Sequence, residues 1–341
     1  MRAISSRRDF LKATATTTAA ATALTLFQGT LCTKENTRGV AIILSPQDAK
    51  EKPAQWVAAE LHDALKSRGV AVEIFDSLEQ TPAGFDCIIA ATAGSSVGKQ
   101  ALAATGISLP DVPEAVGLAR GKLGNRRFLL ATGSDVRGLV YVVLELADRV
   151  NFAVDPLDEL SNIQPTVEKP ANRIRSIARA FVSEVEDKPW FNDREMWLRY
   201  LTTLATQRFN RFNLSLGIGY DFLQNVTDAY FLFAYPFLLS VPGYDVRVTE
   251  LSDAERDRNL EMLKFISEES VARGLQFQLG IWMHGYDWSD SPHANYRIEG
   301  LSRENHGPYC RDAVCALLKA CPAIGGITFR IHGESCCRRQ L

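Results

Sequence analysis

The sequence has 341 residues, of which 46% are hydrophobic and 23% are charged, and its formal net charge is −2. A chain of this length and apolar content can bury two hydrophobic cores. The nearly balanced charge gives no electrostatic support for binding nucleic acid, so we expect no nucleic-acid partner.

The amino terminus has the pattern of an export signal. Two adjacent arginines, Arg7 and Arg8, precede Phe10 and a weakly apolar, Ala- and Thr-rich stretch at 13–27. Paired arginines followed by a segment of modest hydrophobicity are typical of a twin-arginine signal. We therefore predict a signal peptide over 1–36 and export by the twin-arginine machinery to the periplasm or the medium. No other segment is long and apolar enough to predict a stable membrane span.

Strands and helices alternate from Gly39 onwards. Short apolar runs predict buried strands, and apolar residues at helical spacing predict amphipathic helices. The predicted strands are 40–44, 70–75, 85–90 and 127–131, and the predicted helices are 53–68 and 137–150. Gly124-Asn125 predicts a hairpin turn before the last of these strands. We expect a small α/β, sandwich-like domain over 37–165.

Cofactor and metal patterns are weak in this sequence. The two glycines of Gly94-Ser-Ser-Val-Gly98 are separated by three residues where a phosphate loop has four, and Gln100 replaces the Ser or Thr that binds magnesium. A strand-to-helix turn is the expected structure there. The seven cysteines and five histidines follow no zinc-site spacing. We expect neither a cofactor nor a bound metal.

A second alternating segment follows a proline-containing linker, which we place at 166–172. Beyond it, strands are predicted at 174–181, 211–216, 276–282 and 326–332, and helices at 193–208, 253–273 and 308–320. Four β-α repeats with right-handed connections are the first half of a (β/α)8 (TIM) barrel, which we expect over 173–335. A Rossmann-like sheet gives the same alternation, but its glycine fingerprint is absent.

Polar side chains recur on one face of three of these predicted strands. Alternate residues of a strand share a face, so we expect the polar set to converge near the carboxyl ends of the strands, where barrel enzymes place their sites. The candidate site residues are Asn210, Asn213, Trp282, His284, Trp288, Arg330, His332 and Glu334.

Glu334 is the candidate general acid, because enclosure at a strand end can raise the pKa of a carboxyl group. Arg330 and His332 are candidate substrate ligands, and a structural ion pair between Arg330 and Glu184 is the alternative. We expect Glu184 and Glu186, which follow the first strand, to be solvated.

Trp282, His284 and Trp288 belong to an aromatic and polar segment that suits stacking on sugar rings, with loop packing as the alternative. Asn210 and Asn213 are candidate binders of sugar hydroxyl groups.

One motif resembles a known group of enzymes. Gly133-Ser-Asp-Val-Arg-Gly-Leu-Val-Tyr141, followed by Leu144-Glu-Leu-Ala-Asp-Arg149, resembles the closing helix of an N-terminal domain in secreted bacterial glycoside hydrolases. These enzymes have an α-glucuronidase-like or hexosaminidase-like α/β domain and then a (β/α)8 catalytic barrel. The resemblance implies an acid at the end of the fourth barrel strand, which Glu334 matches. Gly333 departs from the Asp-Glu pair of hexosaminidases, so uronic-acid-containing plant or algal polysaccharides fit better.

Glycoside hydrolysis needs two carboxyl groups across the scissile bond, and the second one normally comes from a later strand. A complete barrel takes about 250 residues, so we expect that this chain holds only part of one, that 336–341 is an aberrant tail, and that the chain as it stands is inactive. A non-catalytic carbohydrate-binding or interaction protein is the alternative. A third hypothesis is an oxidoreductase, because twin-arginine cargo proteins include enzymes of this class.

Overall fold

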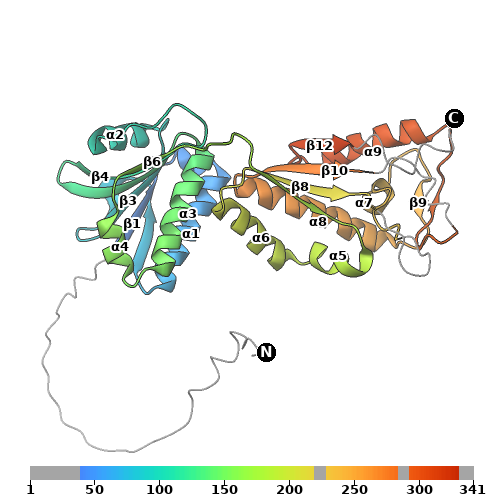
Figure 1. Cartoon of the computed structure of the whole chain (residues 1–341), viewed down its shortest axis with the longest axis horizontal. Helices are drawn as coiled ribbons and strands as arrows, with labels where there is room; N and C mark the ends of the chain where they lie inside the picture. Colours follow the sequence, from blue (N-terminus) through green and yellow to red (C-terminus); the bar gives the residue numbers. More distant parts are fainter. Residues whose placement is uncertain (1–38, 219–227, 283–291, 330–341) are drawn as a thin grey trace, which may run out of the picture. The chain divides into compact units, whose positions relative to one another are not determined.

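A computed structural model of the protein describes residues 39–218, 228–282 and 292–329. Figure 1 shows two sheets with their helices in this part of the chain. The N-terminal sheet has the strand order β2-β1-β3-β5-β4-β6, and the second sheet has the order β12-β10-β8-β7. The mixed α/β fold class is therefore confirmed.

The N-terminal sheet has helices on both faces. Strands β1, β2, β3 and β5 are parallel, whereas β4 pairs antiparallel with both β5 and β6. The strands are β1 Gly39–Leu44, β2 Ala71–Phe75, β3 Asp86–Thr92, β4 Val116–Leu123, β5 Arg126–Gly133 and β6 Thr166–Glu168, and the helices are α1 Lys52–Ser67, α2 Ser96–Thr105, α3 Val136–Phe152 and α4 Pro156–Asn162. Alternate residues of β1 belong to two separate cores, one shared with α1 and α3 and one with α2.

Local sequence explains most of these elements. Val57, Leu61 and Leu65 recur every four residues and are buried along one side of α1. The predicted hairpin is confirmed, because Leu123 pairs with Arg126 across a two-residue turn. The predicted strand-to-helix turn is also confirmed: Ser95 caps α2, accepting a hydrogen bond from the backbone N–H of Gly98 at 3.1 Å.

One boundary prediction needs correction. Thr166–Glu168, which the sequence places in the linker, is strand β6 and pairs with β4. Three residues suffice to form an edge strand although Pro165 and Pro170 flank them, because neither proline has to donate a hydrogen bond within it. The irregular part of the connection therefore begins after Glu168.

The second sheet is parallel throughout, and its strands are neighbours in chain order. Its strands are β7 Ser176–Ala180, β8 Arg211–Leu216, β10 Gln276–Ile281 and β12 Gly326–Phe329. The helices of this part are α5 Glu184–Phe191, α6 Arg194–Thr206, α7 Tyr235–Leu238, α8 Asp253–Ala272 and α9 His306–Ala320. In the loops, the short strand β9 Arg247–Val248 pairs with β11 Ile298–Glu299. The predicted strand at 211–216 is matched by β8, and the other predicted elements are offset by a few residues.

One face of the second sheet is a hydrophobic core. Phe212, Leu214 and Leu216 of β8 are fully buried, as are Phe277 and Leu279 of β10. They pack with apolar side chains of α6, α8 and α9 in a single cluster that is rich in aromatic rings. The helices therefore cover this face, and the opposite face carries the other residues of each strand.

The buried carboxylate of Glu114 connects the two sheets. Arg137 of α3 and the side-chain amide of Asn210 donate to Glu114 Oε1 at 2.8 and 2.9 Å, and Arg175 donates to Oε2. Burial alone would raise the pKa of Glu114, but these three hydrogen bonds outweigh burial and lower it. Glu114 therefore stays ionised between two arginines that come from different parts of the chain.

The motif at 133–141 holds this carboxylate in place. Asp135 caps α3 by accepting from the Gly138 N–H at 2.8 Å, and its second oxygen accepts from the Glu114 N–H at 3.1 Å. The latter bond supports Glu114 in a left-handed conformation with φ of 64°, which is unfavourable for a residue with a side chain. Tyr141 extends the connection by donating to the carbonyl oxygen of Phe209 at 3.1 Å.

We predict that Glu114→Gln lowers the free energy of unfolding by about 2–4 kcal/mol at neutral pH, because two arginines lose a buried charged partner. The folded-state pKa of Glu114 lies below its unfolded-state value, so this stabilisation is present at neutral pH and is lost as the pH falls below about 4.5. Denaturant unfolding at several pH values measures both effects.

The exposed Glu186→Gln provides the matched control and should change stability little. A difference between wild type and Glu114→Gln that is unchanged at about pH 3 would contradict the role of the ionised carboxylate.

Candidate functional site

The candidate site is the face of the second sheet that its helices leave uncovered. Strand pairing places Ala178 beside Asn213, and Ala180 beside Ser215. Across β10, Asn213 lies beside Gln278, and Gly280 beside Ser215. These residues alternate with the buried apolar ones, so they share one face, which we name the polar face. Ala178 is exposed, as is Thr328 of β12 on the same face.

Asn213, Ser215 and Gly280 form the centre of the polar face. Ser215 Oγ donates to Asn213 Oδ1 at 2.7 Å, which leaves the amide NH₂ of Asn213 as the available donor. A Cβ atom on Gly280 would lie 2.7 Å from Ser215 Oγ, so glycine is required beside this pair. Ser215 is buried and Asn213 is half-buried, so the role of Asn213 in binding hydroxyl groups stays a prediction.

Trp282 follows β10 directly and is partly buried. Its backbone N–H donates to the Leu216 carbonyl oxygen at 2.9 Å, which continues the pairing of β8 and β10 to their carboxyl ends. By strand alternation, Trp282 belongs to the same face as Gly280 and Gln278. Four other candidates lie outside the described residues, namely His284, Trp288, Arg330 and His332, as does the candidate acid Glu334, so their roles stay predictions.

Asn210 lies apart from this group. It precedes β8 at the amino end of the strand, whereas the expected site lies at the carboxyl ends. Its amide donates to Glu114 and to the Arg173 carbonyl oxygen at 2.9 Å each, and its Oδ1 accepts from the Arg175 N–H at 2.9 Å. Asn210 thus joins the segment before β7 to Glu114, and its role as a binder of sugar hydroxyl groups stays a prediction.

The loops that follow β7, β8 and β10 meet in a network that the sequence does not reveal. The Lys188 network consists of Glu184, Lys188, Tyr230, Glu255 and Tyr296. Lys188 Nζ lies 2.7 Å from Glu184 Oε1 and 2.6 Å from Glu255 Oε1. Tyr296 donates to Glu184 at 2.7 Å, and Tyr230 donates to Glu255 at 3.0 Å. The expectation that Glu184 is solvated is therefore wrong.

Charge pairing decides the protonation of the network. Burial lowers the pKa of Lys188, but its bonds with Glu184 and Glu255 outweigh burial and raise it. Burial raises the pKa of Glu255, but the bonds from Lys188 and Tyr230 outweigh burial and lower it. Glu255 is thus held ionised, which suits a structural partner better than a general acid. The network ties α5 and α8 to the loops that contain Tyr230 and Tyr296.

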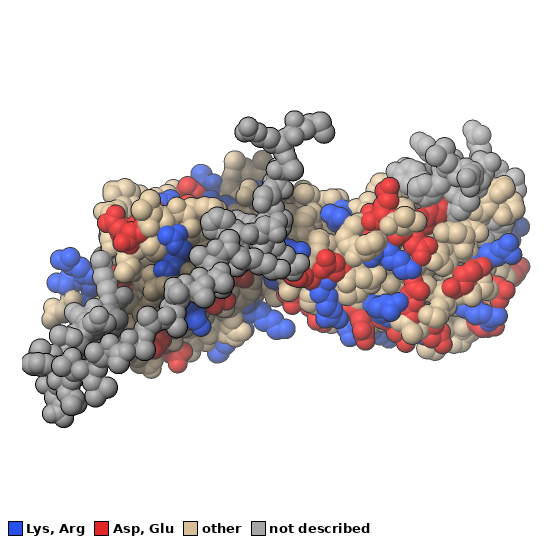
Figure 2. Space-filling view, turned by 90° about the horizontal axis from the view of Figure 1, so that it is seen from below, with Lys and Arg blue, Asp and Glu red and all other residues tan. Residues whose placement is uncertain are grey.

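The described residues contain no cluster of three or more His, Cys, Asp or Glu side chains that could hold a metal ion. Within the same part of the chain, no helix combines the length and apolar character needed to cross a bilayer. On the face seen in Figure 2, basic and acidic side chains are interspersed.

Neither a known protein-family model nor a curated protein sequence matches the chain. Among solved structures, the chain is similar to a GH138 enzyme that targets the pectin rhamnogalacturonan II, with a TM-score of 0.56 and 16% identity over 85% of this chain. The chain spans 30% of the length of that protein. A second structure, CpGH84B, has a TM-score of 0.44 and 11% identity, over 85% of this chain and 39% of that one. The likeness to the GH138 structure supports a glycoside-hydrolase-like fold.

We predict that Lys188→Met lowers the free energy of unfolding by about 1–2 kcal/mol, because it leaves Glu184 and Glu255 facing each other without their shared cation. The pKa of Glu255 should rise, since a cause of its lowering is removed. Denaturant unfolding and an NMR titration of the glutamate carboxyl groups measure the two effects. Lys319→Met, at an exposed position of α9, is the control; an unchanged Glu255 pKa would refute the network.

Proposed function

We propose that the protein is an exported, carbohydrate-active protein of the glycoside hydrolase type, whose second sheet is the first half of a (β/α)8 barrel. The observation that carries this proposal is the order of the strands: β7, β8, β10 and β12 are parallel and adjacent in chain order. Their apolar face packs against helices, and their other face is polar. A barrel has this arrangement, with the helices outside and the polar strand ends at the site.

The N-terminal sheet provides a contrast within the same chain. There the order β2-β1-β3 reverses direction at β1, and helices pack on both faces. That arrangement is doubly wound. The second sheet has no such reversal, so a Rossmann-like arrangement of this segment is not favoured.

The proposed chemistry is acid catalysis by Glu334. Thr328 lies on the polar face through the pairing of β12 with β10. If the strand continues, its alternation assigns Arg330, His332 and Glu334 to the same face. A carboxyl group there could protonate the glycosidic oxygen, with Arg330 and His332 as substrate ligands. The second carboxyl group that hydrolysis requires has no candidate among the described residues of the polar face.

The proposed substrate is a plant or algal polysaccharide that contains uronic acid. The motif at 133–141 resembles that of α-glucuronidase-like enzymes, and the GH138 enzyme targets a pectin. Trp282 would provide a stacking surface and Asn213 would bind hydroxyl groups, and His284 and Trp288 of the same sequence segment are further candidates. The arginine pair at 7–8 supports export by the twin-arginine pathway to the periplasm or the medium.

Tryptophan fluorescence during titration with rhamnogalacturonan II oligosaccharides tests the binding surface. We predict a saturable change that Trp282→Ala weakens by about tenfold, the loss expected for one stacking aromatic ring. Trp56→Ala, in the N-terminal domain, is the matched control and should bind like wild type. The absence of any saturable change would overturn the carbohydrate function.

Release of reducing sugar from the same oligosaccharides tests the reaction. We expect any turnover to be lost in Glu334→Gln, because an amide cannot donate the required proton. Turnover that is equal in wild type and Glu334→Gln would refute Glu334 as the acid. Binding that depends on Trp282 without turnover would instead favour the non-catalytic carbohydrate-binding protein.

A further inference from the structure

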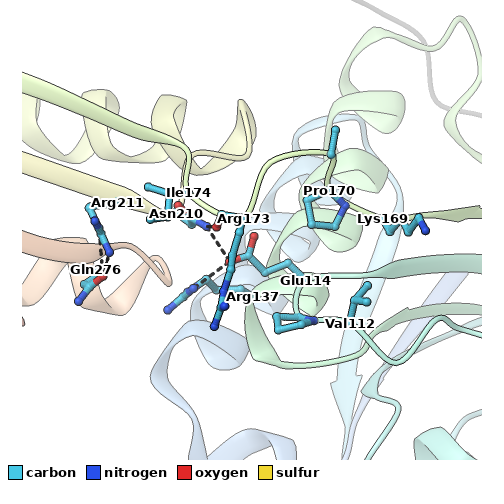
Figure 3. Close-up of a pocket in the computed structure, with 12 residues that line it drawn as sticks. Val112, Glu114, Arg137, Lys169, Pro170, Arg173, Ile174, Asn210, Arg211 and Gln276 are labelled. Atoms are coloured by element: carbon cyan, nitrogen blue, oxygen red, sulfur yellow. Dashed lines mark hydrogen bonds and ion pairs between the residues drawn. The ribbon is translucent and has the colours of Figure 1, made fainter.

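A cavity of about 1000 Å³ lies beside Glu114, at the amino ends of β8 and β10. Figure 3 shows Glu114, Asn210, Arg137 and Arg173 at its centre, with Lys169 and Pro170 on one side and Arg211 and Gln276 on the other. We name it the junction pocket. It lies at the opposite end of the strands from Trp282, so the proposed catalytic site does not account for it.

The junction pocket has an excess of positive charge. Its lining includes the cations Arg137, Lys169, Arg173 and Arg211, against the single carboxylate of Glu114. Arg211 donates to Gln276 Oε1 from Nε and Nη2 at 3.1 and 3.0 Å, and Gln276 is neutral.

Lys169 and Arg173 are the exposed cations of the pocket that lack a carboxylate partner among the described residues. Glu114 is already engaged by Arg137 and Arg175. Within 39–218, 228–282 and 292–329, the side chains of Lys169 and Arg173 form no ion pair, and both residues are exposed. An anionic ligand could therefore bind them without displacing an existing partner.

The pocket also has apolar walls. Val112 is 37% exposed and Ile174 is 57% exposed, and both line the cavity together with Pro170. Leaving apolar side chains exposed to water is unfavourable. Because these side chains lie next to unpaired cations, the pocket suits a ligand with one apolar face and one charged edge. The C–H face of a sugar ring and a carboxylate on that ring provide this combination.

We propose that the junction pocket binds an acidic saccharide, with the carboxylate of a uronic acid residue held by Arg173 and Lys169. The planar guanidinium of Arg173 can form two parallel hydrogen bonds with a carboxylate, and Lys169 adds a point charge. Ring hydroxyl groups can reach Arg211 and Gln276, and the ring packs on Ile174 and Val112. The volume exceeds what a bare inorganic anion needs and holds at least a disaccharide.

Isothermal titration with digalacturonate tests this assignment. We expect saturable binding that Arg173→Gln weakens by about tenfold and Arg173→Gln with Lys169→Gln weakens further, because each change removes a charged donor. Binding should also weaken as salt is added, since exposed charges are screened. Both side chains are exposed, so the variants should fold, and circular dichroism checks this.

Two controls separate the junction pocket from the polar face and from general charge. Arg127→Gln removes an exposed arginine outside the pocket and should bind digalacturonate like wild type. The double variant Arg173→Gln with Lys169→Gln should keep the Trp282-dependent fluorescence change, so loss of the polar-face function and loss of this site are distinguishable. Equal affinity for a neutral galactose disaccharide or for inorganic phosphate, or unchanged binding in the double variant, would overturn the proposal.

Discussion

The ionised, buried carboxylate of Glu114 is the constraint on which the two-sheet arrangement depends. A buried charge is costly unless it is paired, and here the partners come from α3, from the residue before β7 and from the residue before β8. Arg175 in turn donates to the carbonyl oxygens of Arg208 and Asn172 at 2.6 and 2.8 Å, so the segment that enters β7 is held along its length. The start of the second sheet is thereby placed by charge pairing as well as by apolar packing.

The two ends of the second sheet have different chemistry as a result. At the amino ends, Glu114 neutralises part of the basic cluster and leaves Arg173 and Lys169 for an anion. At the carboxyl ends, Lys188 joins α5 to α8, and the polar face carries the half-buried Asn213 and the buried Ser215. Each end is supported by different residues and can be altered separately.

The sequence predicts the elements well where periodicity is strong, as in α1 with Val57, Leu61 and Leu65, and in β8 with Phe212 and Leu214. It does not predict β6, because three residues between prolines carry no periodic signal. The motif at 133–141 is visible in the sequence, but its physical basis, the cap by Asp135 and the pairing of Arg137 with Glu114, is not. The hydrogen bonds of Glu184 and Asn210 are not predicted, because their partners, Tyr296 and Glu114, are about a hundred residues distant in the chain.

A crystal structure of the protein with a bound acidic oligosaccharide tests the central claim most directly, because the claim concerns which face of the second sheet receives the sugar. The account predicts sugar density over Asn213, Ser215 and Gly280, with a ring stacked on Trp282 and no helix covering that face. A polar face that is covered by protein, or an oligosaccharide that leaves it empty while binding elsewhere in the C-terminal half, would contradict the account.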